Sequence, residues 1–290
     1  MSRPTVTFFI TTARSGTQWV ASTLEKAYPD KLVVAHEPIG YDYNPRHSLR
    51  NPDKLREIAN KPSVRKHLDE IHRIIEDKSY VEVGFPAFAM APILREEFGD
   101  RLRLVQMTRH PVKVAASVVT HDWFGEDQRK DIAEKIIVKP TDPGAKLKRY
   151  ASVWKKLSSF ERGLYYWYQV HAYGAELEAT SRPGTFARFK FEKLISDESE
   201  QDRFFGFMGL PPRSEWREST GERVDKFRST TAEEIDTTAL EAHPEILSFA
   251  EELGYNPTRY NAKDLAKRYR RGRVRQLFWR VKNKLLQANQ

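Results

Sequence analysis

The sequence has no cysteine and no long apolar run, and each absence excludes a class of protein. Without cysteine the chain forms no disulfide, no thiolate metal site and no cysteine nucleophile. The uncharged stretch at residues 83–94 is shorter than the ~20 residues that cross a bilayer, and Pro86 and Pro92 interrupt it. The N-terminus leads straight into a strand pattern without an apolar signal segment, so we expect a cytoplasmic protein.

Histidine is too dispersed to suggest a metal site. The eight histidines do not cluster along the chain. His67 and His72 share one predicted helix, but they are five residues apart, off the i, i+4 spacing that places two side chains on one face. We therefore expect no bound metal.

Positive charge is concentrated at the C-terminus. Ten of the 49 Lys and Arg residues, but only one of the 40 Asp and Glu residues, lie between Lys263 and Lys284, so this segment carries the whole net charge of +9. The rest of the chain is balanced and offers nucleic acid no broad basic face. We divide the chain into a domain at residues 1–262 and a basic amphipathic tail at residues 263–290.

The tail also carries apolar residues at helical spacing. They are Val274, Leu277, Phe278, Val281 and Leu285. A basic amphipathic helix is typical of the surface of an anionic membrane, and the alternative is a helix that packs on the body or on a second copy. The first alternative would make the protein peripheral on the inner face of a membrane.

Strand and helix patterns alternate along the domain. The predicted strands are 5–10, 31–35, 80–83, 101–108 and 186–191. The helical patterns are 18–24, 53–77 with a break near Pro62, 112–119, 154–177 and 198–208. Five strand–helix repeats predict an α/β fold with a central, mainly parallel sheet flanked by helices.

The first predicted strand runs into a polar turn, Arg14-Ser15-Gly16-Thr17, and then into a helical pattern. Such a turn points backbone N–H groups and the positive end of a helix dipole at one spot, so it favours phosphate or sulfate. The alternative is an ordinary connection whose Ser and Thr only cap the helix. A nucleoside-triphosphate loop is disfavoured because it needs Gly-Lys-Ser/Thr, whereas Gly16 is followed by Thr17-Gln18.

Candidate side chains also follow two other predicted strands. Glu37 comes after the second strand and Arg109 after the fourth, and residues in these positions meet at the ligand-binding edge of a parallel sheet. Ser117 lies eight residues after Arg109, about two turns into the next helix at ~3.6 residues per turn, so both could hold one phosphate. A solvated loop carboxylate for Glu37 and a water-facing serine for Ser117 are the alternatives.

Four separated parts of the chain share the pattern of one family. They are Ala13-Arg-Ser-Gly-Thr-Gln-Trp19, Arg109-His-Pro-Val-Lys-Val-Ala-Ala-Ser117, Arg188-Phe-Lys-Phe-Glu-Lys-Leu194, and Lys226-Phe-Arg228 with Leu253-Gly-Tyr255. In order and spacing they resemble the 5′-phosphosulfate loop, the 3′-phosphate motif, the Arg-Tyr-Glu-Asp-Leu strand and the closing segment of the sulfotransferases that use 3′-phosphoadenosine 5′-phosphosulfate (PAPS). The likeness is to the carbohydrate-type branch, as found in bacteria, and extends from Thr5 to about Tyr255. Gln18, where many members have Thr, and Phe227, where they often have Trp, depart from the pattern.

This resemblance implies a P-loop-like sulfotransferase fold and a PAPS-dependent sulfotransferase activity. The sulfuryl group would pass to a hydroxyl of a carbohydrate, glycolipid or small-molecule acceptor, and adenosine 3′,5′-bisphosphate (PAP) would leave. No metal is implied, because Arg14 and the loop N–H groups would do what magnesium does in kinases. Two other classes stay open: a P-loop-type phosphotransferase, and a non-catalytic membrane-binding or nucleic-acid-binding protein that acts through its tail.

The resemblance also implies roles for individual residues. Glu37, in His36-Glu37-Pro38, resembles the Glu of a Glu-Pro segment that acts as the general base, and His121 is the reserve candidate. Arg14 is the second catalytic residue. The implied cofactor-binding residues are Arg14, Ser15, Gly16, Thr17, Gln18, Trp19, Arg109, Ser117, Lys226 and Arg228.

Overall fold

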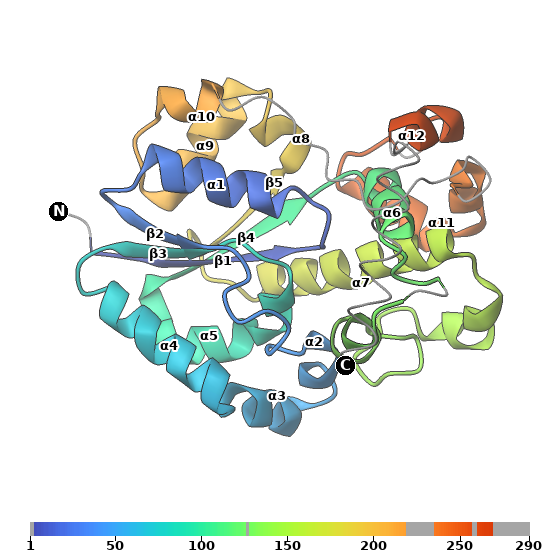
Figure 1. Cartoon of the computed structure of the whole chain (residues 1–290), viewed down its shortest axis with the longest axis horizontal. Helices are drawn as coiled ribbons and strands as arrows, with labels where there is room; N and C mark the ends of the chain where they lie inside the picture. The colour runs from blue at the N-terminus through green and yellow to red at the C-terminus, as the bar shows by residue number, and fades with distance from the viewer. Residues whose placement is uncertain (1–2, 126–127, 219–234, 257–259, 269–290) are drawn as a thin grey trace, which may run out of the picture. The chain divides into compact units, whose positions relative to one another are not determined.

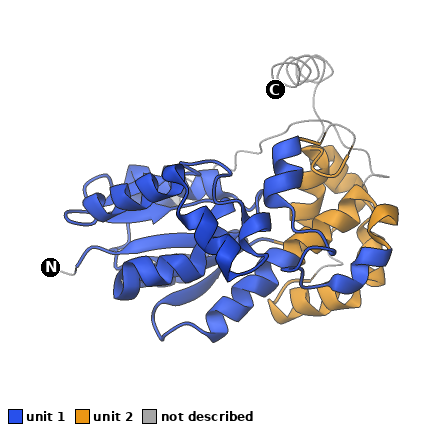
Figure 2. Cartoon of the chain, turned by 90° about the horizontal axis from the view of Figure 1, so that it is seen from below, with its two compact units in different colours: residues 1–109, 130–152, 169–222 blue, residues 110–129, 153–168, 223–290 orange. Residues whose placement is uncertain are grey.

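The computed structural model describes residues 3–125, 128–218, 235–256 and 260–268. The chain forms two compact units (Figure 2). Unit 1 comprises residues 1–109, 130–152 and 169–222, and unit 2 comprises residues 110–129, 153–168 and 223–290. Most of the basic tail predicted at 263–290 lies outside the described residues, which end with α12 (Ala262–Arg268).

A five-stranded parallel sheet forms the centre of unit 1 (Figure 1). Its strands are β1 (Val6–Thr11), β2 (Leu32–Ala35), β3 (Ser79–Glu82), β4 (Leu102–Thr108) and β5 (Phe186–Lys190), in the order β2-β3-β1-β4-β5. All six residues of β1 are buried, as expected of a central strand covered on both faces. The sheet confirms the predicted α/β class. The fifth strand is one residue shorter than predicted, because Phe191 begins α8 (Phe191–Leu194).

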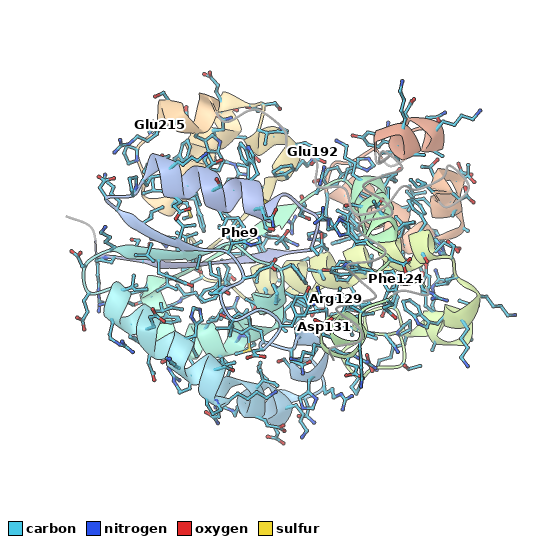
Figure 3. All side chains as sticks on the ribbon, viewed as in Figure 1. Phe9, Phe124, Arg129, Asp131, Glu192 and Glu215 are labelled. Carbon is cyan, nitrogen blue, oxygen red and sulfur yellow. The ribbon has the colours of Figure 1, made fainter. Side chains whose placement is uncertain are left out.

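One face of the sheet is covered by α1 (Thr17–Ala27), α9 (Glu198–Met208) and α10 (Ser214–Glu218) (Figure 1). Aromatic rings fill the space between these helices and the strands: Phe9 of β1, labelled in Figure 3, meets Phe204 edge-on, with ring centroids 6.4 Å apart. Trp216 of α10 is fully buried in the same cluster. These rings fix the position of α1, and with it the loop that precedes α1.

The other face is covered by α4 (Pro62–Ile74) and α5 (Ala91–Phe98) (Figure 1). The predicted helical stretch at 53–77 is divided, as expected, because Pro62 begins α4 after α3 (Pro52–Ala59). The remaining short elements of unit 1 are α2 (Pro45–Ser48), η1 (Pro86–Met90), η2 (Gly99–Arg101), η3 (Ile132–Ile136) and η4 (Lys148–Ser152). Among the described residues, no helix is long and apolar enough to cross a membrane.

The described residues of unit 2 form helices and turns. It contains α6 (Pro111–Thr120), η5 (Trp154–Lys156), the first half of α7 (Ser159–Ala179), η6 (Thr237–Ala242) and α11 (Pro244–Glu252). The predicted helix at 154–177 begins later, at Ser159. The reason is a capping box: Ser158 Oγ accepts from the N–H of Glu161 at 3.2 Å, and Glu161 Oε2 accepts from the N–H of Ser158 at 2.7 Å. Trp154 therefore precedes the helix.

Candidate functional site

The residues that follow the parallel strands of unit 1 gather at the carboxyl edge of the sheet, where ligands bind in folds of this kind. The loop 12–16 follows β1, and His36 with Glu37 follows β2. Arg109 follows β4, and Phe191 follows β5. The sequence predicts this convergence for Arg14, Glu37 and Arg109.

The loop before α1 has the conformation of an anion-binding turn. Arg14 and Gly16 have positive φ angles of 68° and 92°, and Thr12 Oγ1 lies 2.6 Å from Ser15 Oγ within the loop. The N-cap of α1 is Gly16, and no side chain caps the helix. The N-cap position therefore belongs to neither Ser15 nor Thr17, and an ordinary connection between strand and helix stays the alternative. The first N–H groups of an α-helix have no partner within the helix, and here they follow a glycine.

Arg109 is attached to this loop. Its Nη1 donates to the carbonyl oxygen of Arg14 at 2.6 Å, and its guanidinium lies over the ring of Phe191, 5.4 Å from the centroid. The hydrogen bond and the cation–π contact fix the guanidinium from two sides. Arg109, from the end of β4, is thus fixed against the loop that contains Arg14.

Phe191 fixes the other side of the loop. The space that a side chain at Gly16 would need is occupied by the Phe191 ring. Trp19 meets Phe191 edge-on at 5.9 Å between ring centroids and Trp216 at 4.9 Å. Trp19 therefore packs within the aromatic cluster, and its predicted cofactor contact stays a prediction. Gln18 is exposed.

Glu37 has the properties expected of a base at neutral pH. Its side chain is 21% exposed, and burial raises the pKa of Glu37 to about 7. The N–H of Phe85 donates to this carboxylate, and the positive charge of Arg14 lies near it. Both contributions lower the pKa, whereas the charge of Glu82 raises it. Like Arg14, Glu37 has a positive φ, 52°.

His36 links the anion loop to the base. Its Nε2 lies 3.0 Å from Thr17 Oγ1 and 3.7 Å from Glu37 Oε1. Burial lowers the pKa of His36, so the imidazole is neutral at pH 7. The same ring nitrogen thus lies near both the Thr17 hydroxyl and the Glu37 carboxylate, and its hydrogen bond is to Thr17. The sequence places His36 beside Glu37 but does not predict its bond to Thr17.

Four other predicted residues belong to unit 2 or lie outside the described residues. Ser117 is buried on α6, and His121 follows the same helix, so both belong to unit 2. Lys226 and Arg228 lie outside the described residues. The predicted roles of these four residues stay predictions.

The donor set of unit 1 fits an anionic nucleotide. It offers two guanidinium groups, the hydroxyls of Ser15 and Thr17, and the first turn of α1 without a side-chain cap. Gly16 keeps the turn free of a side chain. Hydrogen bonds from charged donors and from N–H groups at a helix start are those that phosphate and sulfate oxygens accept. Within the described part of the chain, no group of three or more His, Cys, Asp or Glu side chains could hold a metal ion.

Comparison with known proteins identifies similar folds. No family model and no curated protein matches the sequence. The sulfotransferase domain of the Synechococcus PCC 7002 olefin synthase has a TM-score of 0.50 at 12% identity, with 88% of this chain and 97% of that domain covered. The sulfotransferase from Alicyclobacillus acidocaldarius has a TM-score of 0.48 at 14% identity, with 87% and 96% covered. The sulfotransferase domain from the curacin biosynthetic pathway has 0.45 at 14%, with 92% and 97% covered.

At these identities the likeness concerns the fold. The shared architecture is the five-stranded parallel sheet flanked by helices, which matches the predicted fold class.

Proposed function

We propose that the protein is a sulfotransferase that moves a sulfuryl group from PAPS to a hydroxyl of a carbohydrate, glycolipid or small-molecule acceptor. The observation that carries this proposal is that an anion-binding loop lies near a base whose pKa is close to neutral pH. Glu37, with a pKa of about 7, lies beside His36, which is bonded to Thr17 of the loop. A carboxylic acid with a strongly raised pKa next to an anion-binding loop is typical of a catalytic site.

Glu37 is the general base of the proposed reaction. The acceptor O–H bond breaks, its proton passes to the Glu37 carboxylate, and the acceptor oxygen bonds to sulfur as the bond from sulfur to the 5′-phosphate oxygen breaks. A base works best when its pKa is near the working pH, and burial gives Glu37 this property. His36, neutral at pH 7, holds the Thr17 hydroxyl without competing for the proton.

Positive charge and backbone donors stabilise the leaving group. Bound PAPS supplies the activated sulfuryl group and a phosphate as leaving group. Arg14 and the N–H groups of residues 15–19 would hold the 5′-phosphosulfate end, and preorganised donors of this kind stabilise charge that develops in the transition state. Arg109, with Ser117 as its predicted partner, would hold the 3′-phosphate. Lys226 and Arg228 would close over the nucleotide.

Transfer of radiolabelled sulfate from PAPS to a panel of sugars, glycolipids and phenols tests this function. We expect transfer to at least one hydroxyl acceptor, and loss of turnover in Glu37→Ala with PAP affinity nearly unchanged. Near-normal kcat in Glu37→Ala would show that another group is the base, and His121→Ala is then the next variant. Magnesium-dependent transfer from ATP without any transfer from PAPS would instead support a P-loop-type phosphotransferase.

We propose further that the basic tail at residues 263–290 binds an anionic membrane. Its support is the sequence pattern alone: ten basic residues surround apolar residues at helical spacing. Co-sedimentation of the full chain and of residues 1–262 with phosphatidylserine-containing vesicles tests it. Equal binding of the two proteins would contradict a membrane tail. Vesicle binding by a protein that transfers sulfate from no donor would favour the non-catalytic alternative.

A further inference from the structure

Four polar side chains of unit 1 form a buried cluster that the proposed reaction does not use. Glu82, the last residue of β3, is 1% exposed. Its Oε2 accepts hydrogen bonds from the hydroxyls of Tyr43 at 3.0 Å and Tyr80 at 3.1 Å, and lies 2.8 Å from Nε2 of His67 on α4. Burial of a carboxylate is costly unless partners compensate it, so three partners from different segments mark a specific arrangement.

The charge of Glu82 is compensated on one oxygen only. Oε1 of the same carboxylate is buried and has no hydrogen-bond partner among the described residues. Burial, with the nearby Glu82 charge, raises the pKa of Tyr43 and the pKa of Tyr80. Both phenols therefore remain protonated and donate to Oε2.

Glu37 lies next to this cluster along β3. Its Cγ occupies the space where a side chain on Gly84 would be, and Gly84 is two residues beyond Glu82. The charge of Glu82 acts on Glu37 from this position. Their repulsion adds to burial in raising the pKa of Glu37.

We propose that Glu82 is a positioning residue for the base: its buried charge, held by Tyr43, His67 and Tyr80, strengthens Glu37 as a proton acceptor. This inference rests on the function proposed above. A carboxylate beside a like charge gains a proton more readily, so Glu82 assists proton removal from the acceptor without contacting it. Because Gly84 has no side chain, Glu37 can occupy the space next to it, near the charge of Glu82.

Other groups act on Glu37 from the elements around it. Arg14, from the loop after β1, opposes Glu82 by favouring the ionised form of Glu37. The N–H of Phe85, from the segment after β3, acts in the same direction as Arg14. His36, from the same segment as Glu37, is neutral at pH 7 because burial lowers its pKa. Glu82 is thus the one negative charge that acts on Glu37 within the described residues.

The experiment is a titration of Glu37 that does not depend on activity. The full-length protein is labelled with ¹³C at the glutamate carboxyl carbon, and the resonance that disappears in Glu37→Gln is assigned to Glu37. In Glu82→Gln, we expect the midpoint to fall from about 7 by about 0.5 pH unit, because burial, the Phe85 N–H and Arg14 each act on this pKa more strongly than Glu82 does. In Glu96→Gln, which removes an exposed carboxylate on α5, we expect no change. An unchanged midpoint in folded Glu82→Gln overturns the proposal.

A second variant covers the case in which Glu82→Gln does not fold. The double variant Tyr43→Phe/Tyr80→Phe keeps both rings and removes two hydroxyl donors from Oε2. Without these two donors the Glu82 carboxylate is no longer fixed in place beside Glu37, so we expect the Glu37 midpoint to move down again. A midpoint that stays fixed or rises in this folded variant also overturns the proposal.

Activity separates this inference from the proposed function. If the wild type transfers sulfate from PAPS, the acid limb of kcat/KM in Glu82→Gln should shift with the Glu37 midpoint while the Kd for PAP stays the same. A shifted midpoint in a wild type that transfers no sulfate supports the carboxylate pair and overturns the proposed reaction. If the wild type transfers sulfate but the Glu37 midpoint is unshifted in Glu82→Gln, the proposed reaction is supported and the role of Glu82 is overturned.

Discussion

The ring of Phe191 fills the space that a side chain at Gly16 would need. The same ring contacts the Arg109 guanidinium on one side and the edge of Trp19 on another. The anion loop, the second arginine and the start of α1 are therefore assembled around one aromatic side chain. Glycine is necessary at position 16 for two independent reasons. A side chain there would clash with Phe191, and the φ of 92° disfavours any residue with a side chain.

We predict that Gly16→Ala weakens PAP binding at least ~10-fold and lowers the free energy of unfolding by about 1–3 kcal/mol, because strain at a positive φ is added to a steric clash. Isothermal titration calorimetry with PAP and urea denaturation measure the two effects. The matched control is Gly206→Ala on α9, where an added Cβ meets nothing within 4 Å. The control should stabilise the protein by roughly 0.5–1 kcal/mol, since alanine is the better helix former.

The aromatic contact can be tested separately from the backbone angle. Adding Phe191→Leu to Gly16→Ala relieves the clash but leaves the φ strain, so we expect partial recovery of PAP binding. No recovery would show that the backbone angle alone requires glycine. Recovery to the wild-type affinity would show that the clash alone does.

Glu37→Gln should stabilise the protein at alkaline pH. The pKa of Glu37 is about 7 in the folded protein and 4.5 as the reference for the unfolded chain. Between these values the folded state binds more protons than the unfolded state, so the free energy of unfolding falls as pH rises. The loss is on the order of 3 kcal/mol by pH 8, and Glu37→Gln avoids it.

Urea denaturation of wild type and Glu37→Gln from pH 4 to pH 8 measures this difference. We expect similar stability at pH 4 and a more stable variant at pH 8. The opposite trend, with the variant relatively less stable at pH 8, would mean that the folded protein prefers the ionised carboxylate.

Arg109→Ala should weaken PAP binding by about 10- to 100-fold, the effect of removing a charged donor from a phosphate. Arg109→Lys should recover only part of this, because Lys lacks the planar fork that bonds the Arg14 carbonyl while stacking on Phe191. The control is Arg103→Ala, near the start of the same strand, which should leave PAP affinity unchanged.

A comparison of ligands assigns the phosphate that Arg109 contacts. If it holds the 3′-phosphate, Arg109→Lys should weaken PAP more than adenosine 5′-phosphate, which lacks that group. If the affinities for both ligands fell equally, Arg109 would act by maintaining the conformation of the loop through its hydrogen bond to the Arg14 carbonyl oxygen.

The His36–Thr17 bond should appear as a coupling energy. In a double-mutant cycle of His36→Ala and Thr17→Val, we expect about 0.5–1.5 kcal/mol of interaction in the free energy of unfolding, the usual contribution of a hydrogen bond between neutral groups. Additive effects would contradict a direct bond in solution. Thr17→Val should also weaken PAP binding, because its hydroxyl is one of the proposed donors.

Periodicity and strand-end placement predict the sheet well. A parallel sheet needs short apolar strands separated by helices, and these signals are local, so the five strands were predictable from residues such as Val6, Phe9 and Leu104. The start of α7 was predicted too early because the apolar pattern continues through Trp154, whereas the Ser158–Glu161 capping box fixes the true start.

The candidate site was less predictable where it depends on contacts between distant segments. Arg14, Glu37 and Arg109 follow strands, so sequence placed them at one edge. In the sequence Glu82 looks like an ordinary residue at the end of a strand. Its partners are distant in sequence: Tyr43 lies in the loop after β2 and His67 lies on α4, so the cluster is recognised only in the folded chain. The need for glycine at position 84 likewise depends on where Glu37 lies.

The positions of the loop and the base in the sheet have a consequence for heat inactivation. Glu37 follows β2, a strand of four residues at the edge of the described sheet, where it pairs with β3. The anion loop follows β1, which pairs with both β3 and β4. Edge segments with few pairings open at lower free energy than the centre of a fold. The base thus belongs to a less stable cooperative unit than the nucleotide loop, and warming should remove turnover before it removes the capacity to bind the nucleotide.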